Sequence, residues 1–328
     1  MLFLNRQEVE SLLDLDRLVD ALGPAMAELS AGRVSLPPRI AAMIPEHDGL
    51  LAAMPAYLGS SHTLAVKLVS VFPGNEQRGL PTHQALIAVF DSSTGTPLAL
   101  MDGATITAAR TAAGSALATR LLARPDASIL AILGTGVQAR AHARIVSRVR
   151  KIQEIRVTGR NPEKAADLAL EISDELKISA RAVATAPEAT KGAGIICAAT
   201  HSPEPVVRGA WLQAGTHVNS VGFNPQGREV DGEALEKSLV VVESRAAALA
   251  PFPSGSNDLA WAIRDGLITK EHIHAEVGEV VSGARPGRTS PEQITLYKSV
   301  GVAVQDAVAA QLVLDAARRS GVGREIEI

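Results

Sequence analysis

The order of apolar and polar residues divides the chain into two kinds of pattern. In residues 14–32 apolar side chains return every three or four positions, which predicts an amphipathic helix. Strand-like runs follow at residues 49–58, 64–72, 83–91 and 97–103, separated by turn signals such as PGNEQRGLP and DSSTGTP. A helix over residues 107–123 comes next. This first part is therefore predicted to be an α+β domain with a mostly antiparallel sheet.

Short apolar runs alternate with helical patterns from Ser128 onward. The run SILAIL, residues 128–133, has the length of a strand that is buried on both faces. A second strand over residues 154–159 precedes a helix over residues 161–176, which Asn161 caps and Pro162 opens. Further apolar strands follow in GIICAAT, THVNSVG and SLVVVES. Repeated strand–helix units of this kind predict an α/β fold with a parallel, doubly wound sheet.

The last long segment, residues 300–321, is rich in alanine and valine. It predicts one helix that is apolar enough to need cover on more than one side. We expect this helix to return to the first domain, which makes that domain discontinuous. The predicted organisation is a first domain of residues 1–120 and 299–328, and a nucleotide-binding domain of residues 121–298.

Composition narrows the class of protein without changing this picture. The net charge of −3 and the aromatic content of 3% give no electrostatic case for nucleic-acid binding. The single cysteine, Cys197, excludes disulfides within the chain and a zinc site built from a cysteine cluster. The first residues do not have the pattern of a signal peptide, and no apolar run approaches the ~18 residues of a membrane span. We expect a soluble, cytoplasmic protein without a metal site.

The sequence G-x-G-x-x-A follows the strand at residues 128–133 and opens a helix. This is the context that a Rossmann-type dinucleotide fingerprint requires. Gly134 makes the tight turn, Gly136 lets the backbone approach a pyrophosphate, and the small Ala139 lets helix and strand pack closely. The helix N-terminus offers unpaired N–H groups to the phosphates. The alternative is a glycine-rich turn that binds nothing.

The end of the second strand bears on the choice between NAD(H) and NADP(H). NAD-binding domains have an acidic residue there, which binds the adenosine ribose. This chain has Gly159 at that place, followed by Arg160 and Asn161. A guanidinium suits a 2′-phosphate, although Arg160 could equally be a solvated loop residue. The missing acid favours NADP(H), with NAD(H) as the alternative.

Three cations of the first domain stand in unusual surroundings. Lys67 lies inside the apolar strand LAVKLVSVF, Arg39 follows two prolines, and Arg110 lies in a helix of small residues. A lysine in such a strand often extends to the surface, and an arginine in such a helix can simply pair with a carboxylate. Beside a nucleotide fold, the three together also suggest a site for a small anion such as an α-carboxylate.

The chain resembles the ornithine cyclodeaminase/mu-crystallin family. The resemblance spans residues 39 to 306 in family order and is most specific from Asp102 to Ala141; its motifs are RIAAM, MPAY, VKLVSVFPGN, PTHQA, DGATITAARTAAGSALAT, ILGTGVQARAHA, VNSVG, GREVD and TLYKSVGVAVQD. It implies a homodimer whose first domain, completed by the C-terminal helix, forms the subunit interface. It also implies hydride transfer between NAD(P) and the α-carbon of an amino or imino acid at the domain cleft.

The resemblance also implies roles for individual residues. Arg39 and Arg110 would clamp the substrate carboxylate, and Lys67 would contact that carboxylate and the reacting nitrogen, as proton donor or electrostatic partner. The cofactor would be bound at the phosphates by Thr111, Gly134, Thr135, Gly136, Val137 and Gln138, at the 2′-phosphate by Arg160 and Asn161, and on the nicotinamide side by Thr200, Ser220, Val221 and Gly222, with Lys298 and Ser299 closing the pocket. His83 in PTHQA is a candidate for a supporting role, and equally for an ordinary structural histidine.

One departure from the family pattern affects the predicted reaction. In ornithine cyclodeaminases the segment after this VG holds an aspartate that manages proton transfer, whereas this chain has Asn224 and one residue fewer before GREVD. Asparagine can orient a substrate amine but cannot accept a proton. We therefore expect a reductase of a ketimine or of 1-pyrroline-2-carboxylate, or an amino-acid dehydrogenase such as alanine dehydrogenase.

Two alternatives stay open at this point. A true cyclodeaminase would convert ornithine to proline and ammonia and regenerate its NAD within one turnover. A non-catalytic protein that binds NADPH and a ligand, as mu-crystallin-like members can, would not need the complete set of Lys67, Arg39 and Arg110. The sequence does not fix the substrate's side chain or the physiological direction.

Overall fold

The computed structural model describes residues 1–251 and 254–327, and the chain divides into two compact units. Unit 1 consists of Met1–Arg110 and Val302–Ile328, and unit 2 of Thr111–Gly301. The first boundary lies within helix α3 (Gly103–Leu122), and the chain re-enters unit 1 just before helix α11 (Ala303–Ser320).

Unit 1 is built on one sheet of eight strands in the order β16-β1-β7-β6-β5-β4-β2, with β3 paired to β4. The pairs are antiparallel apart from β1 with β7. The strands are β1 (Leu2–Leu4), β2 (Val34–Ser35), β3 (Ile40–Ile44), β4 (Gly49–Leu58), β5 (Thr63–Val71), β6 (His83–Asp91), β7 (Pro97–Asp102) and β16 (Arg324–Glu325). The prediction of a mostly antiparallel sheet here is confirmed.

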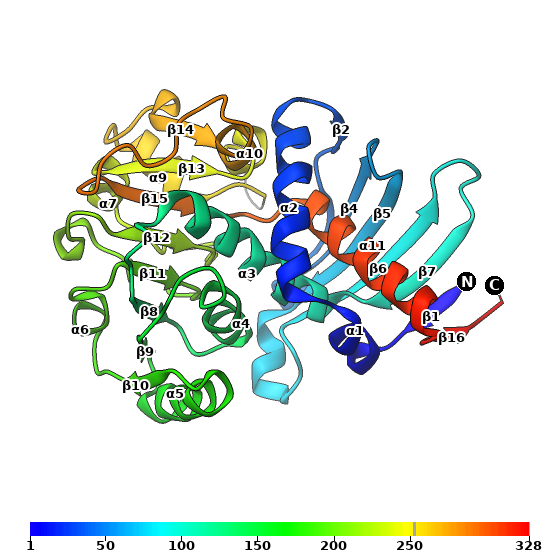
Figure 1. Ribbon diagram of the computed structural model, residues 1–328, viewed down its shortest axis with the longest axis horizontal. Helices are drawn as coiled ribbons and strands as arrows, with labels where there is room; N and C mark the ends of the chain where they lie inside the picture. Colours follow the sequence, from blue (N-terminus) through cyan, green and yellow to red (C-terminus); the bar gives the residue numbers. More distant parts are fainter. Residues whose placement is uncertain (252–253, 328) are drawn as a thin grey trace. The chain divides into compact units, whose positions relative to one another are not determined.

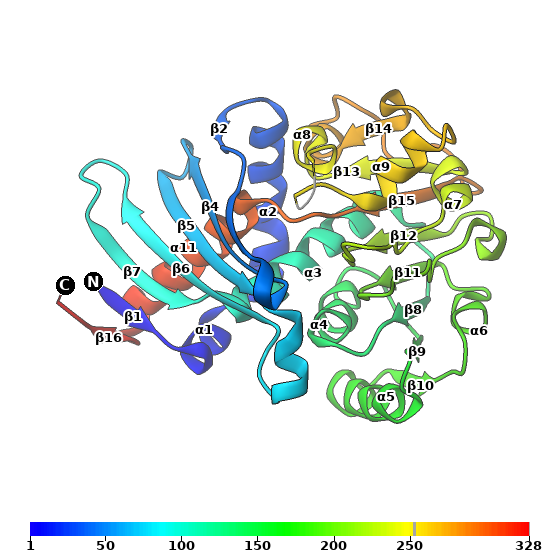
Figure 2. The ribbon, with the colours of Figure 1, turned by 180° about the vertical axis from the view of Figure 1, so that it is seen from behind.

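Helices cover one face of this sheet. The helices are α1 (Arg6–Leu12), α2 (Leu15–Ser30) and α11, and α11 packs against α2 and the central strands β4, β5 and β6. Figure 1 shows α2 and α11 in front of the strands, and Figure 2 shows the strands from their other side. The buried residues of α2 include Leu18, Leu22 and Met26, which recur at the helical spacing that predicted this element.

Unit 2 contains an eight-stranded parallel sheet in the order β10-β9-β8-β11-β12-β15-β13-β14. The strands are β8 (Ile129–Leu133), β9 (Glu154–Thr158), β10 (Ser179–Ala182), β11 (Ile195–Ala198), β12 (His217–Ser220), β13 (Ser238–Val242), β14 (Ile273–Glu276) and β15 (Ile294–Lys298). Strands β9 and β10 extend from one side of β8, whereas β11 and β12 extend from the other. The prediction of a doubly wound sheet is confirmed, and its topological switch point lies between β8 and β11.

The helices of unit 2 connect these strands, as parallel pairing requires. They are α4 (Val137–Val146), α5 (Pro162–Leu176), α6 (Ala186–Thr190), α7 (Gly232–Glu236), α8 (Arg245–Ala248), α9 (Asn257–Arg264) and α10 (Val277–Val281). Asn161 caps α5 as predicted, because its side-chain oxygen accepts a hydrogen bond from the Lys164 N–H at 3.0 Å. Leu130, Ala131 and Ile132 of β8 are fully buried, as expected for a central parallel strand.

No helix in the described ranges is both long enough and apolar enough to cross a membrane.

Candidate functional site

Three elements of unit 1 bring charged side chains together in its interior. Lys67 lies on β5, Arg110 on α3 and Asp306 on α11, and all three side chains are buried. The Lys67 Nζ lies 3.0 Å from each carboxylate oxygen of Asp306, and the Arg110 Nε donates to Oδ1 at 2.9 Å. The Arg110 Nη1 also donates to the Gln305 side chain at 3.0 Å. Two cations thus share one carboxylate.

Burial and neighbouring charge change the protonation of this group. The pKa of Lys67 is lowered from 10.5 to about 8, mainly by burial and also by the fields of Arg110 and Arg39, while Asp306 opposes the change. Although burial raises the pKa of Asp306, the fields of Arg110 and Lys67 hold it below its ordinary value. Arg39, Lys67, Arg110 and Asp306 are here named the cationic cluster. Three of these four residues are positive, which suits the binding of a small carboxylate.

His83 belongs to the same face of the unit 1 sheet as Lys67. In the β5–β6 ladder Lys67 is opposite Ile87 and Val71 is opposite His83, so both side chains lie on the face that α11 covers. Burial, together with the fields of Lys67 and Arg110, lowers the pKa of His83 to about 4. The imidazole is therefore neutral near pH 7.

The fingerprint in unit 2 has the backbone that a dinucleotide requires. Gly134 has φ +121°, and a Cβ there would lie 2.6 Å from the Ala199 carbonyl oxygen, so glycine is needed for both reasons. A Cβ at Gly136 would meet nothing within 4 Å. Gly136 is the N-cap of α4, and within the described residues no side chain caps this helix. Open space before uncapped N–H groups fits a pyrophosphate.

The remaining phosphate-side candidates come from the segment after β9, from α4 and from α3. A Cβ at Gly159 would lie 2.7 Å from the Thr135 methyl group, so the glycine at the end of β9 packs closely against the fingerprint loop. Arg160 is exposed directly after it, and the Asn161 oxygen is engaged in capping α5. The other three candidates differ in burial: Val137 is exposed, Gln138 is half-buried and Thr111 is buried on α3.

On the other side of the switch point, a buried carboxylate organises the predicted nicotinamide-side residues. Both oxygens of Glu229 accept hydrogen bonds: Oε1 from the N–H and Oγ of Thr200, and Oε2 from the Ser220 Oγ and the Gly222 N–H. Lys298 donates to Ser220 Oγ and to the Gly222 carbonyl, both at 3.0 Å. Val221 lies between these positions, where its N–H donates to the Ala198 carbonyl.

Lys298 also pairs with Asp258, whose Oδ2 lies 2.8 Å from its Nζ. The side chains of both are almost fully buried. Ser220, Glu229, Asp258 and Lys298 are here named the carboxylate network. A separate buried carboxylate, Glu243, accepts from Ser299 Oγ and from the N–H groups of Val300 and Gly301. The loops after β11, β12 and β15 are therefore all fixed by acidic side chains.

Asn224 is engaged in its own loop. Its Nδ2 donates to the His201 carbonyl at 2.7 Å, and its Oδ1 accepts from the Gln226 N–H at 2.8 Å. Its backbone carbonyl accepts from Asn257. The Asn224 amide thus shapes the segment after β12.

Sequence reasoning missed the acidic partners of both clusters. Asp306 and Glu229 stand inside the motifs quoted above, whereas Asp258 follows Ser256 and Asn257, and Glu243 precedes Ser244. Only Asp306 offers a usable signal, because it lies in a long apolar helix, where a carboxylate needs an internal partner. The partner itself was not readable, since Lys67 and Asp306 are 239 positions apart.

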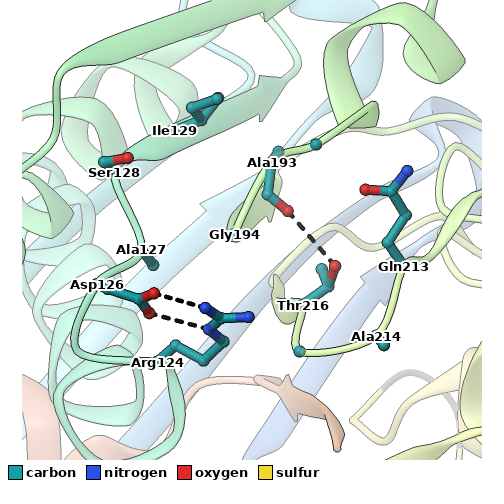
Figure 3. A pocket seen from close by; sticks show the side chains of 12 residues that line it. Arg124, Asp126, Ala127, Ser128, Ile129, Ala193, Gly194, Gln213, Ala214 and Thr216 are labelled. Carbon is teal, nitrogen blue, oxygen red and sulfur yellow. Dashed lines mark hydrogen bonds and ion pairs between the residues drawn. The ribbon is translucent and has the colours of Figure 1, made fainter. Parts of the chain in front are cut away.

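The cavity in Figure 3 lies at the opposite edge of the unit 2 sheet. It measures about 220 Å³ and is lined by residues at the amino ends of β8, β11 and β12, such as Ser128, Gly194 and Thr216. Its arginine, Arg124, is paired with Asp126 through contacts of 2.9 and 2.5 Å. Ligands of doubly wound folds bind at the carboxyl ends, so this cavity is separate from the candidate site.

Comparisons with known proteins agree with these features. The model of the ornithine cyclodeaminase/mu-crystallin family matches residues 1–321. Ketimine reductase mu-crystallin of Mus musculus is 39% identical over 318 residues, which cover 95% of this chain and 96% of that protein.

Two solved structures are similar over the whole length. The Δ¹-pyrroline-2-carboxylate reductase of Thermococcus litoralis, in complex with NADH and L-proline, is 42% identical with a TM-score of 0.96, covering 99% of this chain and 100% of that one. An archaeal alanine dehydrogenase dimer with bound NAD is 33% identical with a TM-score of 0.92, covering 100% and 99%. The chain belongs to the ornithine cyclodeaminase/mu-crystallin family.

Proposed function

We propose that this protein is an NAD(P)H-dependent oxidoreductase that transfers hydride to or from the α-carbon of a small imino or amino acid. The observation that carries the proposal is the cationic cluster of unit 1, in which Lys67 and Arg110 share one buried carboxylate and the field of Arg39 reaches Lys67, in a chain that also has a dinucleotide fingerprint. The similarity to a pyrroline-2-carboxylate reductase and an alanine dehydrogenase supports the same reaction class.

The cationic cluster would act on the substrate. Arg39 and Arg110 hold the carboxylate, and Asp306 fixes Arg110 and Lys67 from the opposite side. Reduction of an imine needs a protonated nitrogen, so that hydride attacks an electron-poor carbon. Lys67, with a pKa of about 8, is suited to hold or donate that proton near neutral pH.

Unit 2 would hold the cofactor. The bound nicotinamide supplies or accepts the hydride. Gly134, Thr135 and Gly136 would receive the pyrophosphate together with Val137, Gln138 and Thr111. The loops with Thr200, Ser220, Val221 and Gly222 would receive the nicotinamide end, with Lys298 and Ser299 beside them.

We further propose a preference for NADP(H) over NAD(H). Arg160 is exposed next to Gly159, at the place where an acidic side chain would exclude a 2′-phosphate.

The uncovered face of the unit 1 sheet would form a homodimer. Ile40, Ala53, Leu68 and Leu86 are successive cross-strand neighbours on β3, β4, β5 and β6, and Ile40, Leu68 and Leu86 are 71%, 42% and 46% exposed. A contiguous exposed apolar row marks an interaction surface, and a second copy is the commonest partner. The dimeric state of the archaeal relative supports this assignment.

Asn224 favours reduction over cyclodeamination. A neutral amide that is engaged with the His201 carbonyl and the Gln226 N–H cannot take a proton from water or substrate. We therefore expect no release of ammonia from ornithine.

The test is a panel of cyclic ketimines and amino acids, assayed at 340 nm with NADPH and with NADH. Consumption of reduced cofactor with 1-pyrroline-2-carboxylate is expected. Formation of proline and ammonia from ornithine, with constant absorbance at 340 nm, would establish the cyclodeaminase instead. Binding of NADPH without turnover of any substrate would leave a binding protein.

A further inference from the structure

Glu229 is not one of the residues that the sequence analysis assigns to substrate or cofactor. Its side chain nevertheless accepts more hydrogen bonds than any other carboxylate described above in unit 2. Its carboxylate is buried and accepts four hydrogen bonds of 2.7–2.9 Å. They come from Thr200, after β11, and from Ser220 and Gly222, at the end of β12. One side chain therefore ties together the ends of two adjacent parallel strands.

The position of Glu229 is itself fixed by Asp258 and Lys298. Asp258 Oδ1 accepts from the N–H groups of Glu229 and Val230 at 2.7 and 2.8 Å, and its Oδ2 pairs with Lys298. Lys298 donates in turn to Ser220, whose hydroxyl donates to Glu229. The contacts close a ring, so that the carboxylate of Glu229 has little freedom to turn.

The loop after β12 packs so closely against Glu229 that position 222 has no room for a side chain. A Cβ at Gly222 would overlap the Glu229 carboxylate and the Thr200 carbonyl. The backbone of residue 222 is held against the carboxylate on one side and bonded through its carbonyl to Lys298 on the other. The Glu229 and Lys298 side chains therefore hold this loop from two sides.

The place of these loops in the sheet indicates which half of a dinucleotide they would meet. In a doubly wound fold the pyrophosphate lies at the fingerprint helix, and the adenosine ribose lies toward the second strand, here β9. The other half of the cofactor extends past the switch point, toward β11 and β12. Thr200, Ser220 and Gly222 lie there.

We propose that Glu229 is a positioning residue for the nicotinamide half of the cofactor, acting through Thr200, Ser220 and Gly222 without touching the reacting atoms. This inference rests on the proposed function. A carboxylate is required because all four contacts are donors. Glutamine would place an NH₂ group against two of them, and a buried donor that faces a donor loses its hydrogen bond.

The experiment compares two ligands that differ only by the nicotinamide ring. Dissociation constants for NADH and for ADP-ribose are measured by calorimetry on the wild type, on Glu229→Gln and on Asp231→Asn. Asp231, two residues after Glu229, is the matched control. Its carboxylate also accepts hydrogen bonds from backbone N–H groups, those of Gly209 and Ala234, but none from the loops after β11 and β12 among the hydrogen bonds described. In Glu229→Gln the NADH constant should rise about tenfold, while the ADP-ribose constant changes less than about twofold. Asp231→Asn should lower the melting temperature and leave the ratio of the two constants unchanged.

Equal weakening of both ligands, or of neither, in folded Glu229→Gln would overturn the positioning role. Where that variant does not fold, Ser220→Ala removes one donor to the carboxylate without adding another, and it should weaken NADH selectively by about threefold. If Ser220→Ala changes the dissociation constants of NADH and ADP-ribose by the same factor relative to wild type, the proposal is overturned there as well. If wild-type protein binds neither these two ligands nor NADPH, the proposed function itself is wrong, which is a different outcome.

Discussion

The cationic cluster of unit 1 and the carboxylate network of unit 2 use the same residue types in opposite proportions. In the cationic cluster Lys67 and Arg110 contact one carboxylate, Asp306, and Arg39 adds a third positive charge whose field reaches Lys67. In the carboxylate network one positive residue, Lys298, lies among two carboxylates, Glu229 and Asp258. The ion pairs of both clusters are buried, so removing their charges from water has a similar cost in free energy. The two clusters differ in the interactions that offset this cost.

The difference lies in what satisfies the charge. Glu229 and Asp258 accept from backbone N–H groups and hydroxyls of their own unit, so the carboxylate network fixes backbone. The cationic cluster retains an excess of positive charge, which adds to burial, the larger cause, in lowering the pKa of Lys67. An additional carboxylate would relieve that excess. Buried positive charge in excess of its internal carboxylates thus indicates a binding site, whereas buried carboxylates that are satisfied by backbone N–H and hydroxyl groups indicate a scaffold.

The largest effect is expected from Lys67→Met, which removes one positive charge of the cationic cluster but keeps the length of the side chain. Loss of the proton donor should lower kcat/KM for reduction of 1-pyrroline-2-carboxylate by about 100- to 10,000-fold. Binding of NADPH should remain, because Lys67 belongs to unit 1 and the fingerprint to unit 2. Steady-state kinetics and cofactor titration measure the two effects separately.

An active Lys67→Met enzyme would show that the proton comes from another group. His83 is next in line, since its imidazole shares the sheet face of Lys67 and responds to its charge.

A smaller effect is expected from Arg39→Ala. Arg39 is half-buried and its field reaches Lys67, so it can be removed with less damage to the core than Arg110. Loss of one charged hydrogen bond to the substrate should cost about 1.5–3 kcal/mol, or roughly ten- to a hundredfold in kcat/KM. The change should appear for every carboxylate substrate and leave the melting temperature nearly unaltered. Normal kinetics in this variant would mean that Arg39 is only structural.

Arg160→Ala provides a contrast to these substitutions, because Arg160 belongs to neither the cationic cluster nor the carboxylate network. It should affect the choice of cofactor and leave the chemical step alone. We expect KM for NADPH to rise by about tenfold, equivalent to about 1.5 kcal/mol, and KM for NADH to stay nearly constant. A wild-type protein that already prefers NADH would contradict the assignment of Arg160 to a 2′-phosphate.

The elements were predictable from the sequence where local signals set them. The runs at 49–58 and 83–91 correspond to β4 and β6 residue for residue, and Asn161 caps α5 as expected. The helix predicted from residue 107 begins at Gly103. Glycine is required there, because a Cβ would lie 2.9 Å from the Ala85 backbone, a contact that no local pattern reveals.

The sites were predictable only in part, for a related reason. Apolar surroundings made Lys67 conspicuous, but its partner Asp306 comes from the far end of the chain. Similarly, β15 inserts between β12 and β13, which brings Lys298 to Ser220 and Asp258. Hydrophobic patterns fix which residues are buried but not which strands become neighbours. The acidic half of each cluster therefore emerged only from the structure.

The smallest effect is expected from pH, and it tests whether Lys67 acts as an acid. With a pKa of about 8, its protonated fraction falls about tenfold between pH 7 and pH 9, and kcat/KM for reduction should fall by the same factor. Lys67→Arg keeps the positive charge but does not titrate in this range, so its profile should lack this limb. An unchanged profile in Lys67→Arg would assign the limb to the substrate imine.

The sign of the stability effect separates this limb from unfolding. Burial places the pKa of Lys67 in the folded protein below its value of 10.5 in the unfolded chain. Between about pH 8 and 10.5 the unfolded chain therefore binds more protons at this residue, and the contribution of Lys67 to folding stability rises with pH. Activity that depends on protonated Lys67 falls over the same window. Thermal melts at pH 7, 8 and 9, compared between wild type and Lys67→Met, should show the wild type gaining stability relative to the variant as its activity declines. A parallel loss of both in the wild type would assign the alkaline limb to unfolding and remove Lys67 from the role of acid.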